Sequence, residues 1–129
     1  MKKEFGTTRN GETASCYILK NSKGMKAVVS DFGAILVKLI VPNKDGEKAD
    51  VVLGFDHLEQ YEENPNFFGS TVGRSANRIG GAAFQIDGVT YHLTANENEN
   101  NLHSDFYHGF HKVLWNADMK DGENAVVFS

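Results

Sequence analysis

Turn signals at short, regular intervals constrain the fold of this chain more than any other feature of its sequence. The strongest is the pair Asp87-Gly88, which stands between alternating flanks in 84-FQIDGVTYHL-93. An Asp-Gly pair in this setting is the clearest short-range signal for a β-hairpin. Short strands separated by regular turns are typical of sandwiches and barrels. The sequence therefore predicts an all-β fold, an antiparallel β-sandwich.

The other expected strands coincide with apolar runs bounded by turn residues. They are 15–21, 25–33, 33–42, 50–55, 112–119 and 125–129, with a turn at 121–124 between the last two. The run 50-DVVLGF-55 is short and apolar, which is typical of a strand covered on both faces. One helix is expected at 57-HLEQYEEN-64. It should end before Pro65, because the residue preceding a proline is pushed out of the α region.

Composition argues against several classes of function. The chain has 129 residues, which suits one domain, and a net charge of -4 with acidic and basic side chains well mixed. It therefore has no basic stripe for a nucleic-acid backbone. No apolar stretch approaches the roughly 18 residues of a membrane span or resembles a signal peptide. We expect a soluble cytoplasmic protein with no nucleic-acid or membrane partner, in which the one cysteine, Cys16, is buried.

Two segments, 64–81 and 94–110, are too long for ordinary connections. Each contains aromatic or large apolar residues that would anchor it to the core, which argues against disorder. Each also contains planar polar side chains: Arg74, Asn77 and Arg78 in the first, and Asn96, Asn98, Asn100, Asn101 and His103 in the second. Such groups suit the hydroxyls of a sugar. Alternatively, the arginines form surface ion pairs and the asparagines satisfy the loop backbone.

Histidines and carboxylates of the second segment offer two further kinds of site. Three histidines could converge on a metal, namely His103, His108 and His111. Zinc sites normally use ligand pairs at tight spacing with a further ligand, so we expect solvent-facing histidines and neither a metal nor a cofactor. Three carboxylates could supply a catalytic base, namely Glu97, Glu99 and Asp105. A base needs burial or a charged partner to shift its pKa, and this segment is polar.

Five stretches, taken in order, resemble the aldose 1-epimerase (galactose mutarotase) family. They are 54-GFDHLEQY-61, 69-GSTVGRSANRI-79, the hairpin 84-FQIDGVTYHL-93, 96-NENENNLH-103 and 109-GFHKVLW-115. The likeness begins upstream of these motifs and covers nearly the whole chain. Two polar motifs in matching order and spacing make it specific. It implies that residues 1–129 form the N-terminal portion of a single large β-sandwich domain.

The resemblance also implies an activity, the interconversion of the α and β anomers of an aldohexose such as galactose or glucose. In the family, the arginine of the NRI triplet and the histidine of the LH pair contact the sugar. By position these are Arg78 and His103, with Asn77 beside the first, whereas we expect Arg74 to hold its loop. Anomer exchange needs a base at the C1 hydroxyl and an acid at the ring oxygen. Because arginine stays protonated, Arg78 and His103 cannot supply both transfers.

The chain departs from the family in two respects. Members are more than twice as long, and the catalytic glutamate and histidine that the resemblance implies lie beyond Ser129, so we expect no catalytic residue within this chain. Ser104 and Asp105 replace glycines after the LH pair, which would re-aim His103. A truncated sandwich would expose strand edges and self-associate. Three alternatives stay open: a mutarotase, a non-catalytic sugar-binding fragment and an inactive truncated product.

Overall fold

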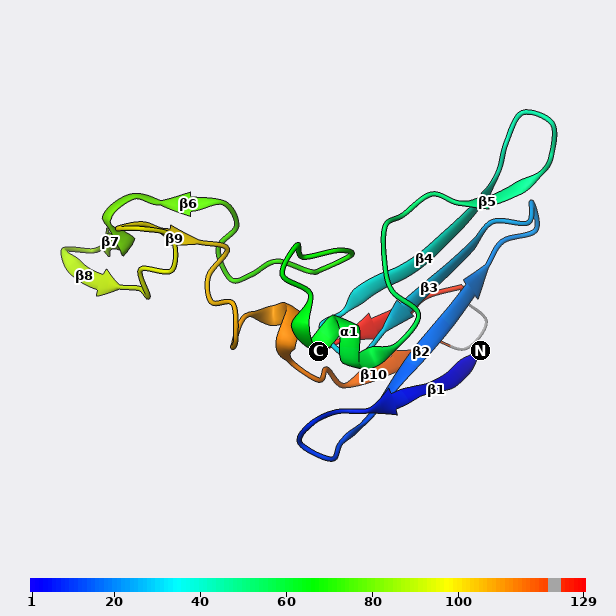
Figure 1. Ribbon diagram of the computed structural model, residues 1–129, viewed down its shortest axis with the longest axis horizontal. Helices are drawn as coiled ribbons and strands as arrows, with labels where there is room; N and C mark the ends of the chain where they lie inside the picture. Colours follow the sequence, from blue (N-terminus) through cyan, green and yellow to red (C-terminus); the bar gives the residue numbers. More distant parts are fainter. Residues whose placement is uncertain (121–123) are drawn as a thin grey trace.

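A five-stranded antiparallel sheet is the largest element of the computed structural model, which describes residues 1–120 and 124–129. Its strands follow one another in chain order and are β1 (Lys2–Thr7), β2 (Thr13–Lys20), β3 (Lys26–Ser30), β4 (Ile35–Pro42) and β5 (Lys48–Asp50). Each strand pairs with the one before it, so the sheet is a meander. Figure 1 shows it at one end of an elongated molecule.

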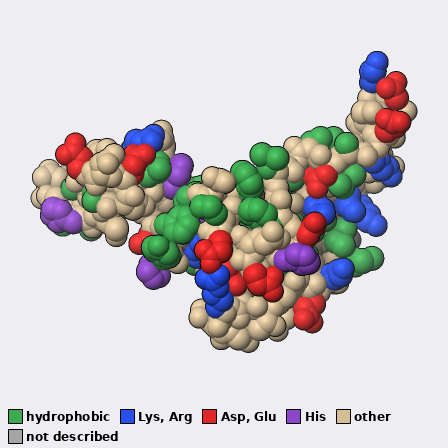
Figure 2. All heavy atoms as spheres, in the orientation of Figure 1, with side chains coloured by type: hydrophobic (Ala, Val, Ile, Leu, Met, Phe, Trp, Pro, Cys, Tyr) green, Lys and Arg blue, Asp and Glu red, His purple; other side chains and the backbone are tan. Residues whose placement is uncertain are grey.

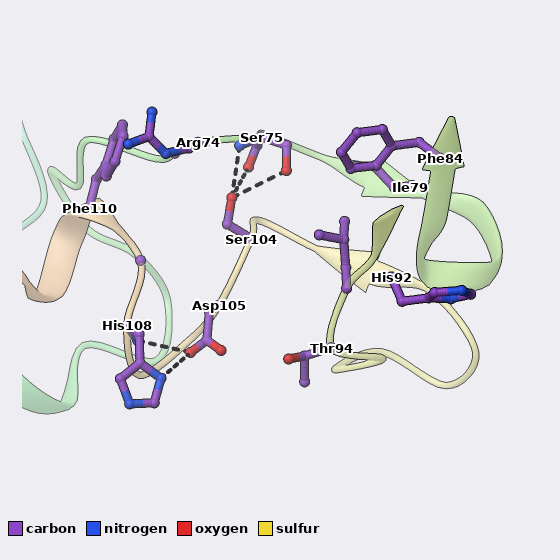
Figure 3. Close-up of a pocket in the computed structure, with 13 residues that line it drawn as sticks. Arg74, Ser75, Ile79, Phe84, His92, Thr94, Ser104, Asp105, His108 and Phe110 are labelled. Atoms are coloured by element: carbon purple, nitrogen blue, oxygen red, sulfur yellow. Dashed lines mark hydrogen bonds and ion pairs between the residues drawn. The ribbon is translucent and has the colours of Figure 1, made fainter. Parts of the chain in front are cut away.

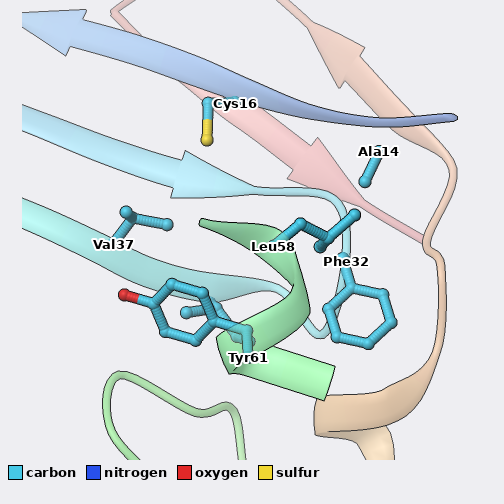
Figure 4. Packing of buried hydrophobic residues seen from close by; sticks show 7 residues of the cluster. Ala14, Cys16, Phe32, Val37, Leu58 and Tyr61 are labelled. Atoms are coloured by element: carbon cyan, nitrogen blue, oxygen red, sulfur yellow. The ribbon is translucent and has the colours of Figure 1, made fainter. Parts of the chain in front are cut away.

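One face of this sheet is covered by the short helix α1 (Leu58–Glu63). Leu58 and Tyr61 of the helix are fully buried against Ala14 and Cys16 of β2, as Figure 4 shows. The rest of this core cluster consists of Phe32, Ile35 and Val37. Burial raises the pKa of the Cys16 thiol to about 11, and the charge of Asp31 adds to the effect. Cys16 is thus a small core side chain, as predicted.

The opposite face of the sheet is covered by the hairpin of β10 (Ala117–Met119) and β11 (Val126–Phe128). Side chains alternate along a strand, so Tyr17 points away from its neighbour Cys16. The Tyr17 ring packs edge-on against Phe128, with ring centroids 5.9 Å apart. Strand β2 therefore has packing partners on both of its faces.

The other end of the molecule is built from short strands. β6 (Arg78–Ile79) pairs with β9 (Asn101–Leu102), and β7 (Ala83–Ile86) pairs with β8 (Val89–His92). Two 3-10 turns flank these pairs, Gly80–Ala82 and Phe110–Lys112. Figure 1 shows this lobe, which we call the β6–β9 lobe (residues 78–102), projecting from the five-stranded sheet.

Local signals predicted several of these elements correctly. The all-β fold is confirmed. In the β7–β8 hairpin, Asp87 and Gly88 have φ values of 50° and 78°, which is the left-handed pair that an Asp-Gly turn provides. The helix predicted at 57–64 occupies Leu58–Glu63 and ends before Pro65.

The strand predicted at 50–55 is wrong beyond Asp50. The Asp50 carboxylate accepts the N–H of Leu39 at 3.0 Å, a place that a backbone carbonyl would take if the ladder continued. The chain then turns toward α1, where Phe55 donates its N–H to the Tyr61 hydroxyl at 2.9 Å. Leu53, expected to be covered on both faces, is instead 72% exposed.

The strand predicted at 112–119 is reduced to Ala117–Met119. Lys112 lies in a 3-10 turn, and its ammonium donates to the carbonyl of Glu62 at 2.6 Å, at the carboxyl end of α1. A cation there satisfies helix carbonyls that have no partner within the helix, and this contact holds the segment away from an extended path. The turn predicted at 121–124 falls mainly on residues 121–123, which lie outside the described residues.

Apolar side chains also reach the surface. Figure 2 shows them between the two ends of the molecule. The β7–β8 hairpin exposes four, namely Phe84, Ile86, Val89 and Tyr91. Association between copies of the chain stays a prediction. Within the parts of the chain that the structure describes, no helix is long and apolar enough to cross a membrane.

Candidate functional site

The β6–β9 pair brings the sequence-predicted sugar contacts together. Arg78 lies opposite Leu102 in this antiparallel ladder. One step further, His103 donates its N–H to the carbonyl of Asn77 at 3.0 Å. Asn77 and Arg78 of the first long loop therefore lie opposite His103 and its neighbour Leu102 of the second.

The imidazole of His103 is held by the backbone of Asn77. The N–H of Asn77 donates to His103 Nδ1 at 2.9 Å. Both residues have left-handed backbones, with φ values of 57° and 55°, which ends the ladder at this pair. Because Nδ1 accepts a hydrogen bond, the neutral ring carries its proton on Nε2. His103 thus has one N–H donor that can meet a ligand.

Arg78 forms a two-point ion pair with Glu97. Its Nε donates to Glu97 Oε2 at 2.6 Å and its Nη2 to Glu97 Oε1 at 2.5 Å. The hydrogen bond from Arg78 lowers the pKa of the Glu97 carboxyl against an opposing effect of desolvation, and the charge of His103 adds to the lowering. The same bond raises the pKa of Arg78. The surface ion pair considered from sequence is therefore present at Arg78. His103 lies close enough to Glu97 to affect the pKa of its carboxyl.

Three asparagines of the second loop bind backbone groups with their side chains. Asn96 donates to the carbonyl of Leu102 at 2.8 Å and accepts the N–H of Leu102 at 2.6 Å. The Asn101 side chain is fully buried and donates to the carbonyl of Thr94 at 2.9 Å. Asn100 accepts a backbone N–H from the turn after β6. For these three residues the structure favours the backbone-satisfying role over direct sugar contact.

Phe67 was missed by sequence reasoning as a neighbour of the site. Its ring centroid lies 5.2 Å from that of His103, 4.5 Å from His111 and 5.8 Å from Phe106. The one available signal was an aromatic residue in the first long loop. His111 was expected to face solvent, but it is only 1% exposed, because Phe67 and Phe106 pack against its ring.

Two contacts join the long loops beside this site. The Ser104 hydroxyl donates to the carbonyl of Ser75 at 2.8 Å and accepts the N–H of Ser75 at the same distance. The guanidinium of Arg74 lies over the ring of Phe110, with its carbon 5.5 Å from the ring centroid. Ser104, which stands where the family has a glycine, thus joins one loop to the other. Arg74 also contacts the other loop, in line with the loop-holding role expected of it.

A cavity of about 640 Å³ opens next to the predicted site and does not include it. Ile79 and Ser104 line this cavity, whereas their chain neighbours Arg78 and His103 do not. Figure 3 shows its other walls, formed by Arg74, Ser75, Phe84, His92, Thr94, Asp105, His108 and Phe110. The predicted sugar contacts therefore lie beside this cavity and do not line it.

Carboxylates and histidines of the second loop have structural partners. Burial acts to raise the pKa of Asp105, but hydrogen bonds from the N–H groups of Tyr107 and His108 outweigh it and lower that pKa. The pKa of the Glu97 carboxyl is also lowered, by its hydrogen bond from Arg78. A general base near neutral pH needs a raised pKa, so neither carboxylate is suited to that role. The described residues contain no group of three or more potential metal ligands.

Comparison with known proteins shows which family this arrangement belongs to. Residues 15–129 match the sequence profile of the aldose 1-epimerase family. The chain belongs to the aldose 1-epimerase family. The family resemblance and the isomerase class inferred from the motifs agree with the names of its relatives, which include galactose mutarotases and an aldose 1-epimerase.

Three relatives of this aldose 1-epimerase family chain illustrate the match. A galactose mutarotase of Rattus norvegicus is 38% identical over 125 residues, covering 97% of this chain and 36% of that protein. A maltose epimerase of Levilactobacillus brevis is 37% identical over 115 residues, covering 89% and 33%. The crystal structure of an aldose epimerase homologue from C. elegans superposes with a TM-score of 0.78 at 34% identity, covering 85% and 34%. The chain spans about a third of the length of these relatives.

Proposed function

We propose that this chain binds an aldohexose through Arg78 and His103 and supplies the sugar-binding part of an aldose 1-epimerase. The observation that carries the proposal is the β6–β9 ladder. In it Arg78 pairs with Leu102, the neighbour of His103 in the chain, and the Asn77 backbone holds His103 Nδ1. Vicinal hydroxyls of a pyranose can accept from both groups, because fixed planar donors suit their spacing. Phe67 lies against the His103 ring and offers an apolar surface for a sugar face.

The chemistry of anomer exchange assigns limited roles to these residues. A base removes the proton of the C1 hydroxyl while an acid protonates the ring oxygen; the ring opens, the aldehyde rotates, and the reverse transfers close it. Arg78 orients hydroxyls and stabilises developing negative charge. His103 holds a hydroxyl through Nε2–H, while its Nδ1 is occupied by the Asn77 backbone. We assign the acid and the base to the part of the relatives that this chain does not match.

Arg78→Ala is expected to weaken galactose binding by about tenfold or more, since it removes charge-assisted hydrogen bonds to the sugar. The measurement is an NMR titration of the His103 ring signals with galactose. Arg74→Ala is the matched control, because Arg74 lies on the same loop and packs on Phe110; this variant should keep the affinity of the parent chain. Equal affinities for Arg78→Ala and the parent would contradict the proposal.

The chain alone is expected to leave the mutarotation rate of freshly dissolved α-galactose at that of buffer, because we assign the acid and the base to residues outside it. Polarimetry measures this directly. A rate above buffer that disappears in His103→Gln would show instead that residues within 1–129 perform both transfers. This result would favour a complete mutarotase over a sugar-binding fragment.

A further inference from the structure

In the ion pair between Arg78 and Glu97, the two side chains differ in their exposure to solvent. The Glu97 side chain is 29% exposed and the Arg78 side chain 55%. The carboxylate is therefore the inner partner and the guanidinium the outer one. Glu97 engages Nε and one hydrogen of Nη2, and a guanidinium has five N–H donors in one plane. Three donors of Arg78 thus remain for a ligand on the outer edge.

Glu97 is itself fixed by the loop that carries it. Its N–H and carbonyl bond the carbonyl and N–H of Asn100 at 3.1 and 2.9 Å, which closes a tight turn. The preceding residue, Asn96, is bonded twice to the backbone of Leu102 in β9. Leu102 in turn lies opposite Arg78 in the ladder. The turn that carries the carboxylate is therefore anchored to β9, the strand that pairs with the one presenting the arginine.

We propose that Glu97 is a positioning residue that sets the plane of the Arg78 guanidinium and cancels its charge, so that the site selects uncharged over anionic sugars. This inference rests on the proposed function of Arg78. A free arginine side chain would lose rotational freedom when it binds a ligand, and a guanidinium already locked at two points loses less. The locked pair has no net charge, so it offers donors to hydroxyls without a strong attraction for carboxylates or phosphates.

The opposite role for Glu97 is competition, in which the carboxylate occupies Arg78 and must be displaced before a sugar binds. The two roles predict opposite changes in the affinity for a neutral sugar when Glu97 is replaced. Removing a positioning charge weakens binding of a neutral sugar, whereas removing a competitor strengthens it. A purely structural role predicts equal losses for neutral and anionic sugars, because the whole site would be distorted.

The test compares galactose and galacturonate binding to the parent chain, Glu97→Gln and Glu99→Gln by NMR titration or calorimetry. Glu99 is the matched control because it is an exposed carboxylate in the same turn. For Glu97→Gln we expect galactose binding to weaken about tenfold, while the ratio of galacturonate to galactose affinity rises about tenfold. Glu99→Gln should leave both affinities within about twofold of the parent.

Each other outcome overturns a defined part of this scheme. Galactose affinity that is unchanged or increased in Glu97→Gln, or equal losses for both sugars, overturns the positioning role while the proposed function stands. Galactose affinity that is unchanged in Arg78→Ala overturns the proposed function, and the role of Glu97 with it. Absence of saturable galactose binding to the parent chain overturns both.

Discussion

Leu58→Ala is expected to lower the free energy of unfolding by about 3 to 5 kcal/mol, because a fully buried leucine leaves a cavity that the surrounding core only partly fills. Leu58 is 0% exposed and packs from α1 onto the sheet residues that Figure 4 shows. The total free energy of unfolding of a native domain is only about 5 to 15 kcal/mol. The variant should therefore unfold at a much lower urea concentration, followed by the fluorescence of Trp115.

The matched control for this substitution is Leu53→Ala. Leu53 is 72% exposed, and a substitution there should change the free energy of unfolding by no more than about 0.5 kcal/mol. A loss below about 1 kcal/mol for Leu58→Ala would mean that α1 does not close the core of the five-stranded sheet in solution.

The elements predicted correctly from sequence are those fixed by short-range chemistry. Asp87-Gly88 adopts the left-handed turn that these residue types favour, and its flanks then pair without help from the rest of the chain. Pro65 likewise ends α1 at a position set by local sterics. Neither prediction needed knowledge of what packs against the segment.

The errors arose where a distant contact decides the structure. The run at 50–55 has the composition of a buried strand, but apolar composition does not reveal whether a second layer is present. Lys112 leaves its expected strand because it caps a helix some fifty residues earlier in the chain. The first strand, β1, has no alternating pattern, and it forms because β2 offers an edge for it.

The candidate site shows the same division between local and long-range information. The sequence motifs identified Arg78, Asn77 and His103 as candidate sugar contacts. The pairing of β6 with β9 brings their chain positions close together. Sequence also raised the possibility of an ion pair at Arg78, but it could not name Glu97 among many carboxylates. That choice depends on the turn at Glu97–Asn100, which is closed by two backbone hydrogen bonds. Partner identity therefore required three-dimensional structure.

Acid sensitivity near pH 5 is expected from the buried histidine, His111. Burial lowers the pKa of His111 to about 4, the charge of Lys112 and that of His103 act in the same direction, and the Phe106 carbonyl and Asp105 oppose them. His111 Nδ1 is buried without a hydrogen-bond partner among the described residues. The neutral ring is thus the stable form in the folded chain.

The sign of the effect follows from the two states. Above the usual pKa of about 6.5 both states hold a neutral ring, and His111 does not alter stability with pH. As the pH falls from about 6.5 to 4, His111 binds a proton in the unfolded chain but stays neutral in the folded chain. Protonation therefore favours the unfolded state, and stability is lost. The loss is about 2 kcal/mol by pH 5 and on the order of 3 kcal/mol by pH 4.

His111→Phe separates this effect from that of the carboxylates. Phenylalanine keeps an aromatic ring against Phe67, which lies 4.5 Å from the His111 ring, but it cannot bind a proton. Urea unfolding is measured at pH 7 and at pH 5. The decrease in the free energy of unfolding between these pH values should be about 2 kcal/mol smaller for this variant than for the parent, whatever the stability of the variant at pH 7. His92→Gln changes an exposed histidine and should keep the parent profile. Identical pH slopes for His111→Phe and the parent would mean that the His111 ring is solvated in the folded chain.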